Sequence, residues 1–255
     1  MNVLVCVKRV PMTGGKIVLT ADEQAIATQH LGFTISPHEE CGVEEAVRIV
    51  EQHGGESVVL TLGPPEAEEQ LRDAMALGMD RAIHLVIGDD EDWDAQATAT
   101  AILDAIEAEH AAGVDFDLIF FGNESADSGG YQVGIRVAHA LERPIATGLK
   151  GVAVEAGRVR CEQEVPGGRD VFDLPLPAVV TVKEGLNFPR YPSVPGRMRA
   201  QKKPVTSSSP TAAPARLEKV RLVSPPGDRK EAEILGHGPD AAPKVVELLQ
   251  RIGVA

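Results

Sequence analysis

The residues best suited to chemistry lie in one polar loop that follows a short apolar run. Leu118–Phe121 is unbroken by polar residues, which favours a parallel strand covered on both faces. Gly122 ends this run, and the loop after it leads into a helix-period pattern that begins at Val133. Backbone N–H groups at a helix start attract anions, and Gly129-Gly130 lets the chain approach a phosphate without a Cβ clash. The stretch therefore predicts a phosphate-binding loop.

Other interpretations of this loop stay open. Ser128-Gly129-Gly130 can also be a simple tight turn. A phosphate would repel Asp127, so we place its carboxylate on a ribose hydroxyl, or as a helix cap if no nucleotide binds. The loop matches neither GxxxxGKS/T nor GxGxxG, so nucleotide hydrolysis and nicotinamide chemistry both lose support.

Few other residue patterns point to chemistry. Cys6, Cys41 and Cys161 are an odd number and far apart, which argues against a disulfide framework. The histidines show no HxxxH or HExxH spacing, so we expect no metal site. The acidic run at 89–92 precedes a helix-period segment, where it would complement the N-terminal partial charge of the helix rather than bind a cation. No nucleophile stands beside a base, so we expect no catalytic residue.

Composition limits the function classes. With 255 residues and 43% apolar content, the chain can bury one sizeable core and perhaps an appendage. A net charge of -13 argues against nucleic-acid binding. Met1 leads directly into a short strand with no long apolar segment, so we expect no signal peptide, no membrane insertion and a cytoplasmic protein.

Apolar runs alternate with helix-period segments through the first half of the chain. The predicted strands are Val3–Val7, Ser57–Leu62, Ala82–Ile87 and Leu118–Phe121. Ser36 precedes a proline and, three positions on, a glutamate, which predicts a capped helix start. Such alternation predicts an α/β fold with a mostly parallel sheet and helices on both faces. Ligands of such sheets bind at the carboxyl ends of the strands, where Cys6, Leu62 and the Gly122 loop would meet and which the Ser36 helix start could also face.

The second half of the chain follows a different pattern. Segments 151–154, 158–165 and 170–174 alternate around glycine turns, which predicts an antiparallel appendage, and Ala178–Val182 reads as a buried strand. We expect Thr206–Pro214 to be a flexible linker. Beyond it, Asp240 could cap a helix whose apolar stripe packs on its own core or on another subunit.

A basic segment lies before this linker. No acidic residue occurs from Gly185 to Leu217, although the chain is acidic overall. Its composition fits docking to an acidic protein partner and fits a solvated linker equally well. The basic residues are Arg190, Arg197, Arg199, Lys202 and Lys203, interleaved with Phe188, Tyr191, Val194 and Met198.

Several segments, taken in order, resemble one family. They are VLVCVKRVP at Val3, ISPHEECGVEEAVRI at Ile35, LTLGPPEAEEQLRDAMALGMDRAIHL at Leu60, the GNESADSGGYQVG loop, and LPAVVTVKEGLNFPRYPSVPGRMRAQKKP. Along residues 1–204, and more weakly in the tail, the chain is similar to the beta, or small, subunit of an electron transfer flavoprotein.

The resemblance implies a Rossmann-like nucleotide-binding domain over 1–204 and, over 205–255, a linker and C-terminal arm packed on a partner subunit. It implies a heterodimer with an alpha subunit that holds most of the FAD, and one AMP bound structurally by the beta subunit. Electrons would pass from acyl-CoA or related dehydrogenases, as in fatty acid oxidation, to a quinone reductase.

The resemblance also assigns site residues. The flavin would face Thr13 and His38, and partner recognition would use Arg190, Tyr191, Val194, Arg197 and Met198. The AMP pocket would take Cys6, Ser36, Pro37, His38, Glu39, Leu62, Gly122, Asn123, Ser125, Ala126, Asp127, Ser128, Gly129, Gly130, Tyr131, Gln132, Val133 and Gly134.

The chain departs from the family pattern at three places. Val194 replaces a leucine anchor, the run 127–130 replaces an acidic loop, and His38 replaces an aromatic residue near the flavin. His38 would hydrogen-bond the flavin or only cap its helix. Two alternative functions remain: an electron-bifurcating beta subunit with a second FAD in place of AMP, and a stand-alone adenine-nucleotide-binding protein or enzyme.

Overall fold

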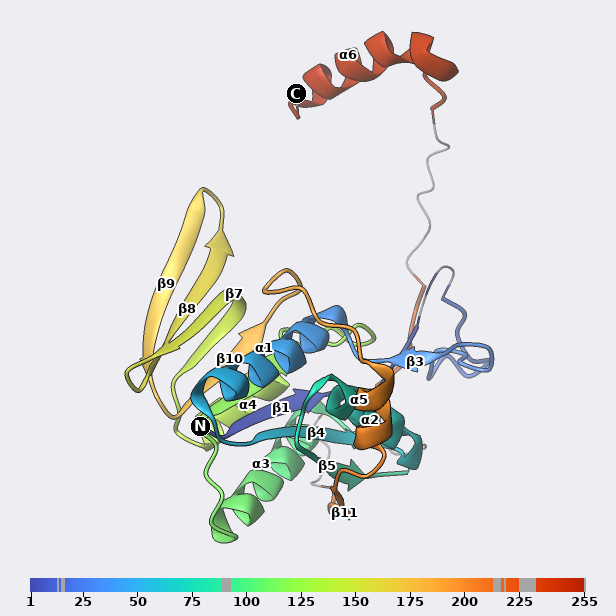
Figure 1. Cartoon of the computed structure of the whole chain (residues 1–255). Helices are drawn as coiled ribbons and strands as arrows, with labels where there is room; N and C mark the ends of the chain where they lie inside the picture. Colours follow the sequence, from blue (N-terminus) through green and yellow to red (C-terminus); the bar gives the residue numbers. More distant parts are fainter. Residues whose placement is uncertain are drawn as a thin grey trace.

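The computed structural model describes residues 1–12, 14, 17–88, 93–212, 217, 219–224 and 233–254. Over these residues the chain forms an α/β fold around a large, mostly parallel sheet with helices on both faces, as the alternating pattern predicts (Figure 1). The strands are β1 (Val3–Val7), β2 (Val10–Pro11), β3 (Phe33–Thr34), β4 (Ser57–Gly63), β5 (Arg81–Val86), β6 (Leu118–Gly122), β7 (Ile145–Glu155), β8 (Arg158–Val165), β9 (Gly168–Pro175), β10 (Ala178–Val182) and β11 (Val205–Ser208). The helices are α1 (Pro37–His53), α2 (Glu68–Leu77), α3 (Ala95–Ala111), α4 (Val133–Ala140), α5 (Val194–Ala200) and α6 (Ala242–Ile252), with short 3-10 turns at Pro65–Ala67 and Gly238–Ala241.

The core lies on both faces of the central strands. Every residue of β1 is buried, and alternate residues enter different clusters: Val3 and Val5 join one, whereas Leu4 and Cys6 join the other. Helices α1 and α2 cover the first face, and α3 and α4 cover the second. This double coverage explains why the strands read as continuous apolar runs.

The strand order positions the candidate site. Within the described residues the large sheet runs β11-β5-β4-β1-β6-β10-β7-β8-β9. The chain moves outward from β1 through β4 to β5 and then continues on the other side of β1 at β6. Such a reversal separates the connections that follow two neighbouring strands, and it leaves a crevice at their carboxyl ends.

The antiparallel appendage is continuous with the main sheet. The first half of β7 pairs in parallel with β10, and its second half pairs antiparallel with β8, which in turn pairs with β9. The ladder shifts between Leu149 and Gly151, next to Gly148 with its φ of +65°. A single long strand therefore belongs to both parts, because this irregularity lets it change partners.

The C-terminal region corrects two expectations. Val205–Ser208 forms β11 and pairs in parallel with β5, so the linker predicted from Thr206 is wrong for its first residues. Asp240 lies in a 3-10 turn and does not cap α6, which follows Ala241 without a side-chain cap. Helix α6 buries no side chain and stands away from the sheet in Figure 1.

The residues before α3 and the length of the helices bear on two further expectations. The acidic run 89–92 lies outside the described residues, and Asp94 caps α3 by accepting a hydrogen bond from Ala97 N–H. In the part of the chain that the structure describes, none of the helices combines the length and the apolar content that a membrane span requires.

Candidate functional site

A pocket of about 390 Å³ opens at the carboxyl ends of β1, β4 and β6. Its volume is in the range of small-ligand sites, roughly 300–1,000 Å³. Cys6, Leu62 and Gly122, each near the end of one of these strands, all line it. The structure thus brings together three residues that lie far apart in the sequence.

The amino-terminal end of α4 forms one wall. Gln132, Val133 and Gly134 line the pocket, and the N–H groups of a first helical turn have no intrahelical acceptor. A Cβ on Gly134 would come within 3.0 Å of the Phe121 ring, so glycine lets this turn pack closely on β6. The wall therefore offers backbone donors and a partial positive charge to an anion.

The loop between β6 and α4 holds its own shape through short polar contacts. The hydroxyls of Ser125 and Ser128 are 2.7 Å apart, and Gly129 N–H donates to the Ser125 carbonyl at 3.0 Å. Gly129 and Tyr131 have φ values of +56° and +54°. These left-handed residues turn the chain toward the start of α4, and at 129 glycine adopts this conformation without strain.

Asp127 forms an ion pair with a residue that sequence reasoning missed. Lys8, just after β1, donates to both carboxylate oxygens at 2.7 and 3.0 Å. Burial alone would raise the Asp127 pKa, but Lys8 and the hydrogen bonds to the loop bring the pKa below its usual value. The expected role of Asp127 as a helix cap is wrong, because α4 begins at Val133 and receives no side-chain cap.

Glu39 connects the start of α1 to the pocket. Its carboxylate accepts hydrogen bonds from Ser36 N–H at 2.8 Å and from Lys8 N–H at 3.0 Å, and the predicted capping box is present. Burial raises the pKa of this carboxyl to about 7 despite these bonds. Burial, with a smaller contribution from Glu39, also raises the pKa of the Cys6 thiol, so this thiol is not a reactive nucleophile.

The remaining walls are largely apolar. Leu60, Ile102, Trp93 and Pro64 line the pocket together with the charged Arg9, and none of these was predicted as a site residue. The order of elements could have indicated Lys8 and Arg9, because they follow a central strand directly. Trp93 gave no such signal, since it enters the site only through the placement of α3.

His38 lies outside the pocket lining. Its Nδ1 accepts a hydrogen bond from Glu184 N–H at 2.7 Å, and its Nε2 is 3.6 Å from a Glu124 carboxylate oxygen. An accepting Nδ1 places the proton of a neutral ring on Nε2. The side chain that caps α1 is Ser36, so the capping role considered for His38 is wrong.

The structure separates the sequence-predicted pocket residues into two sets. The lining includes Cys6, Glu39, Leu62, Gly122, Asn123, Ser125, Ser128, Gly130, Tyr131, Gln132, Val133 and Gly134. The lining does not include Ser36, Pro37, His38, Ala126, Asp127 and Gly129. Thr13 lies outside the described residues.

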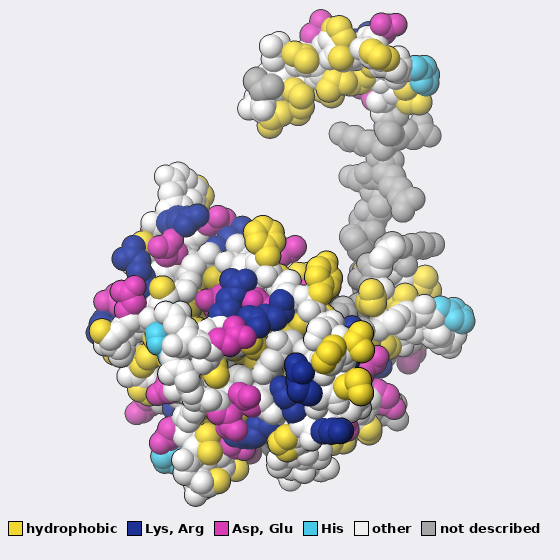
Figure 2. Space-filling model, viewed as in Figure 1, with side chains coloured by type: hydrophobic (Ala, Val, Ile, Leu, Met, Phe, Trp, Pro, Cys, Tyr) yellow, Lys and Arg dark blue, Asp and Glu magenta, His cyan; other side chains and the backbone are white. Residues whose placement is uncertain are grey.

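The basic segment presents apolar side chains to solvent. Phe188 is 93% exposed and Tyr191 is 96% exposed, and Val194 and Met198 on α5 are also exposed. Figure 2 shows hydrophobic and basic side chains side by side over the α2 and α5 region of this face. Apolar side chains held on an ordered surface are typical of a protein-docking site.

Comparison with known proteins identifies the family. Residues 24–213 match the family model described as the electron transfer flavoprotein domain. The Bacillus subtilis (strain 168) protein named electron transfer flavoprotein subunit beta is 33% identical over 257 residues, covering 98% of each chain. This chain belongs to the electron transfer flavoprotein beta-subunit family.

Animal relatives with the same name extend this similarity. The Mus musculus protein is 35% identical over 208 residues, covering 80% of each chain, and the Homo sapiens protein is 33% identical over 211 residues, covering 82% of each chain. Electron transfer flavoprotein beta subunits are components of an electron carrier. Among the described residues, no cluster of His, Cys, Asp and Glu could hold a metal ion.

Proposed function

We propose that this chain is the beta subunit of a cytoplasmic electron carrier, and that it binds AMP as a structural ligand in the pocket beside β1, β4 and β6. With an FAD-bearing alpha subunit it passes electrons from acyl-CoA or related flavin dehydrogenases to a quinone reductase. It has no catalytic activity alone.

One observation carries the AMP assignment. The pocket combines an apolar wall, suited to an adenine ring, with backbone donors at the start of α4, suited to a phosphate. Trp93 lies with Leu60 and Ile102 on the apolar side, and Lys8 is the cation nearest the loop carboxylate at 127. A ribose hydroxyl at Asp127 would have to share this carboxylate with Lys8, which bonds both of its oxygens.

The flavin supplies the redox chemistry when it is bound in the heterodimer. The residues of this chain bind AMP and orient the surface that faces the flavin. The loop between β6 and α4 orders the surface around Glu124 and His38, and that surface covers one side of the flavin held by the alpha subunit. On this surface, His38 Nε2 lies 3.6 Å from a Glu124 carboxylate oxygen.

Co-expression with the alpha subunit tests the proposal. Denaturation should release one FAD and one AMP per heterodimer, as counted by chromatography. Two FAD molecules and no AMP would instead support the bifurcating form. A colourless monomer with no flavin partner would support a stand-alone nucleotide-binding protein.

Trp93 is the only tryptophan in the chain, which provides an independent measurement. Adding AMP to nucleotide-free protein should change its fluorescence, because the indole lines the pocket. A matched titration with inorganic phosphate should change it much less. Equal responses would contradict adenine binding against this wall.

A further inference from the structure

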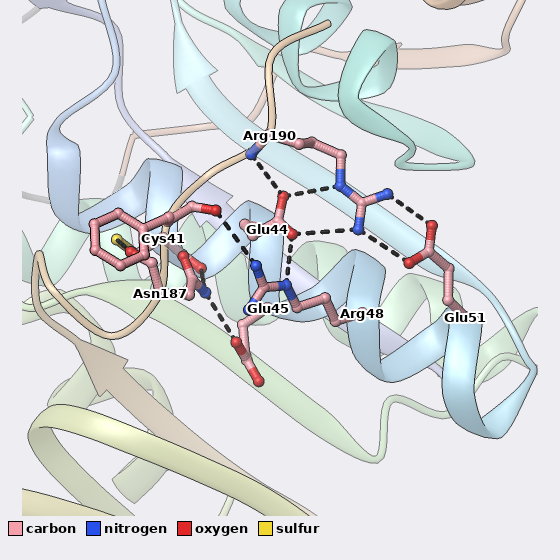
Figure 3. Close-up of polar contacts among 8 residues, drawn as sticks. Cys41, Glu44, Glu45, Arg48, Glu51, Asn187 and Arg190 are labelled. Carbon is pink, nitrogen blue, oxygen red and sulfur yellow. Dashed lines mark hydrogen bonds and ion pairs between the residues drawn. The ribbon is translucent and has the colours of Figure 1, made fainter.

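The chain between β10 and β11 carries the exposed side chains of the basic segment, and its first part is attached to α1 by a charged cluster (Figure 3). Arg190 Nε and backbone N–H both donate to one Glu44 oxygen, at 2.9 and 3.0 Å, and Nη2 reaches the other oxygen at 3.2 Å. The two Nη atoms also bond Glu51, at 2.7 and 2.9 Å. The guanidinium is therefore shared between two carboxylates on the same helix.

The buried carboxylate of Glu44 is the central acceptor of this cluster. Its side chain is only 2% exposed, and Arg48 Nε donates to it at 2.6 Å. Burial would raise its pKa, but the hydrogen bonds from Arg190 and Arg48 outweigh burial and lower the pKa. A buried carboxylate needs such partners, because an unpaired charge in this position is strongly destabilising.

Hydrogen bonds from two side chains fix the residues just before Arg190 to α1. Asn187 Nδ2 donates to the Cys41 carbonyl at 3.0 Å and to Glu45 at 2.8 Å. Arg48 Nη2 donates to the Phe188 carbonyl at 3.3 Å. The stretch 187–190 is thus held to α1 through side chains and main chain together.

The aromatic residues on either side of Arg190 are exposed to solvent. Phe188 and Tyr191 are almost fully exposed, whereas the Arg190 guanidinium turns toward α1. Sequence reasoning placed Arg190 among residues that contact a partner. In the structure its backbone N–H, its Nε and both Nη atoms already donate to carboxylates of the same chain.

We propose that Arg190 is a positioning residue, which with Glu44 and Glu51 fixes the base of the docking surface so that Phe188 and Tyr191 meet the dehydrogenase in a preset arrangement. The inference rests on the proposed function for its partner. Ordering a mobile loop at the moment of docking would cost affinity, and a loop that is already fixed avoids that cost.

Kinetics can separate this role from direct contact. The heterodimer would be reduced by medium-chain acyl-CoA dehydrogenase with octanoyl-CoA as the probe. Arg190→Met and Glu44→Gln should each raise KM for the heterodimer about tenfold and leave kcat unchanged. The double variant should be no worse than either single variant, because both remove the same clamp.

Direct contact makes the opposite prediction for Glu44. If Arg190 bound an acidic group on the dehydrogenase, Glu44→Gln would free its guanidinium and leave KM unchanged or lower it. That result would overturn the inference. Arg190→Lys gives a second comparison: one ammonium cannot bridge both carboxylates as the guanidinium does, so KM should stay raised, whereas full recovery would indicate a simple charge contact.

A partner-free measurement keeps the two proposals distinct. On the isolated full chain, hydrogen exchange of the backbone N–H groups at 187, 188, 190 and 191 should become faster in Arg190→Met and in the milder Glu51→Gln variant. Arg197→Met is the control, because its partner Asp73 is an exposed residue on α2. Unchanged exchange in both clamp variants would refute the clamp. Failure of the dehydrogenase to reduce the unaltered heterodimer would count only against the proposed function.

Discussion

At the scale of single residues, the site depends on groups that are buried next to the ligand pocket. Glu39 is the clearest case, because one carboxylate completes a helix cap and also accepts from the backbone that follows β1. Its environment favours the protonated form, although it makes good hydrogen bonds. The residue therefore connects the stability of the fold to pH.

We predict that Glu39→Gln changes the pH dependence of stability. The pKa is raised from 4.5 to about 7, so between these values the folded protein holds a proton that the unfolded chain has released. The free energy of unfolding should thus fall as pH rises from about 4.5 to 7, by on the order of 3 kcal/mol in full. Urea denaturation across this range should show the decline in the natural chain and not in Glu39→Gln. If the free energy of unfolding changed with pH in the same way in both proteins, the raised pKa of Glu39 would be contradicted.

Two glycines, Gly122 at the end of β6 and Gly130 in the loop that follows, should respond differently to alanine. A Cβ on Gly122 would lie 2.7 Å from Glu39 Cγ, which the capping box holds in place, so Gly122→Ala should lower stability by about 1–3 kcal/mol. A Cβ on Gly130 meets nothing within 4 Å. The Gly130→Ala variant should therefore be as stable as the natural chain. It should bind AMP more weakly in calorimetry, because the added Cβ would hinder the approach of the phosphate. Equal stability losses would show that Gly130 is needed only for the turn.

His38 allows a test of the flavin-facing surface. We expect His38→Phe in the heterodimer to shift the flavin midpoint potential, because it replaces a polar ring, placed beside the Glu124 carboxylate, with an apolar one. Redox titration with a reference dye measures this shift. An unchanged potential would exclude a direct contact between His38 and the flavin.

At the scale of elements, α2 and α5 are joined by two reciprocal caps. Arg72 on α2 donates to the carbonyls of Ala200 and Lys203, at 2.8 and 2.7 Å, at and just beyond the end of α5. Lys203 Nζ in turn donates to the carbonyls of Met75 and Met79, at 3.2 and 2.5 Å, at the end of α2. Cations placed at helix carboxyl ends are favourable, and here each fixes the other helix.

This pair of caps gives an element-scale prediction. Arg72→Met and Lys203→Met should each lower the free energy of unfolding by about 1–2 kcal/mol, since each removes hydrogen bonds from a charged donor. The double variant should lose less than the sum if the two caps act together. Lys202→Met, on an exposed neighbour, is the matched control. Chemical denaturation of the full chain provides the measurement.

At the scale of the whole molecule, the C-terminal arm is attached to the body at a defined point. Leu222 N–H donates to the Glu23 carbonyl at 2.8 Å, and Gln24 Nε2 donates to the Val220 carbonyl at 3.0 Å. Beyond this point α6 exposes apolar residues such as Val245 and Ile252. An amphipathic helix without a buried face needs a partner surface.

We predict that removing residues 233–255 leaves the melting temperature of the isolated chain unchanged, because α6 buries nothing within it. The same truncation should weaken the heterodimer, as measured by analytical ultracentrifugation with the alpha subunit. Val245→Gln should weaken the heterodimer in the same direction, and Glu247→Gln should not. A lower melting temperature of the truncated monomer would mean that α6 packs on its own chain.

Local patterns in the sequence were sufficient for most elements. Ser36 and Pro37 predicted the start of α1, and the runs at Val3 and Leu118 predicted β1 and β6, because caps and apolar periodicity act over a few residues. Val205–Ser208 was mistaken for linker, since a short polar edge strand has no apolar signal and forms only because β5 offers a free edge.

The sequence by itself determined the alternation of strands and helices, the glycine loop after β6 and the family. Only the tertiary structure decided that Lys8 pairs with Asp127, that Trp93 lines the pocket, and that Arg190 faces inward to Glu44. The physical reason is distance along the chain. Propensity and capping depend on neighbours in sequence, whereas ion pairs and pocket walls depend on residues that meet only after the sheet has set its strand order.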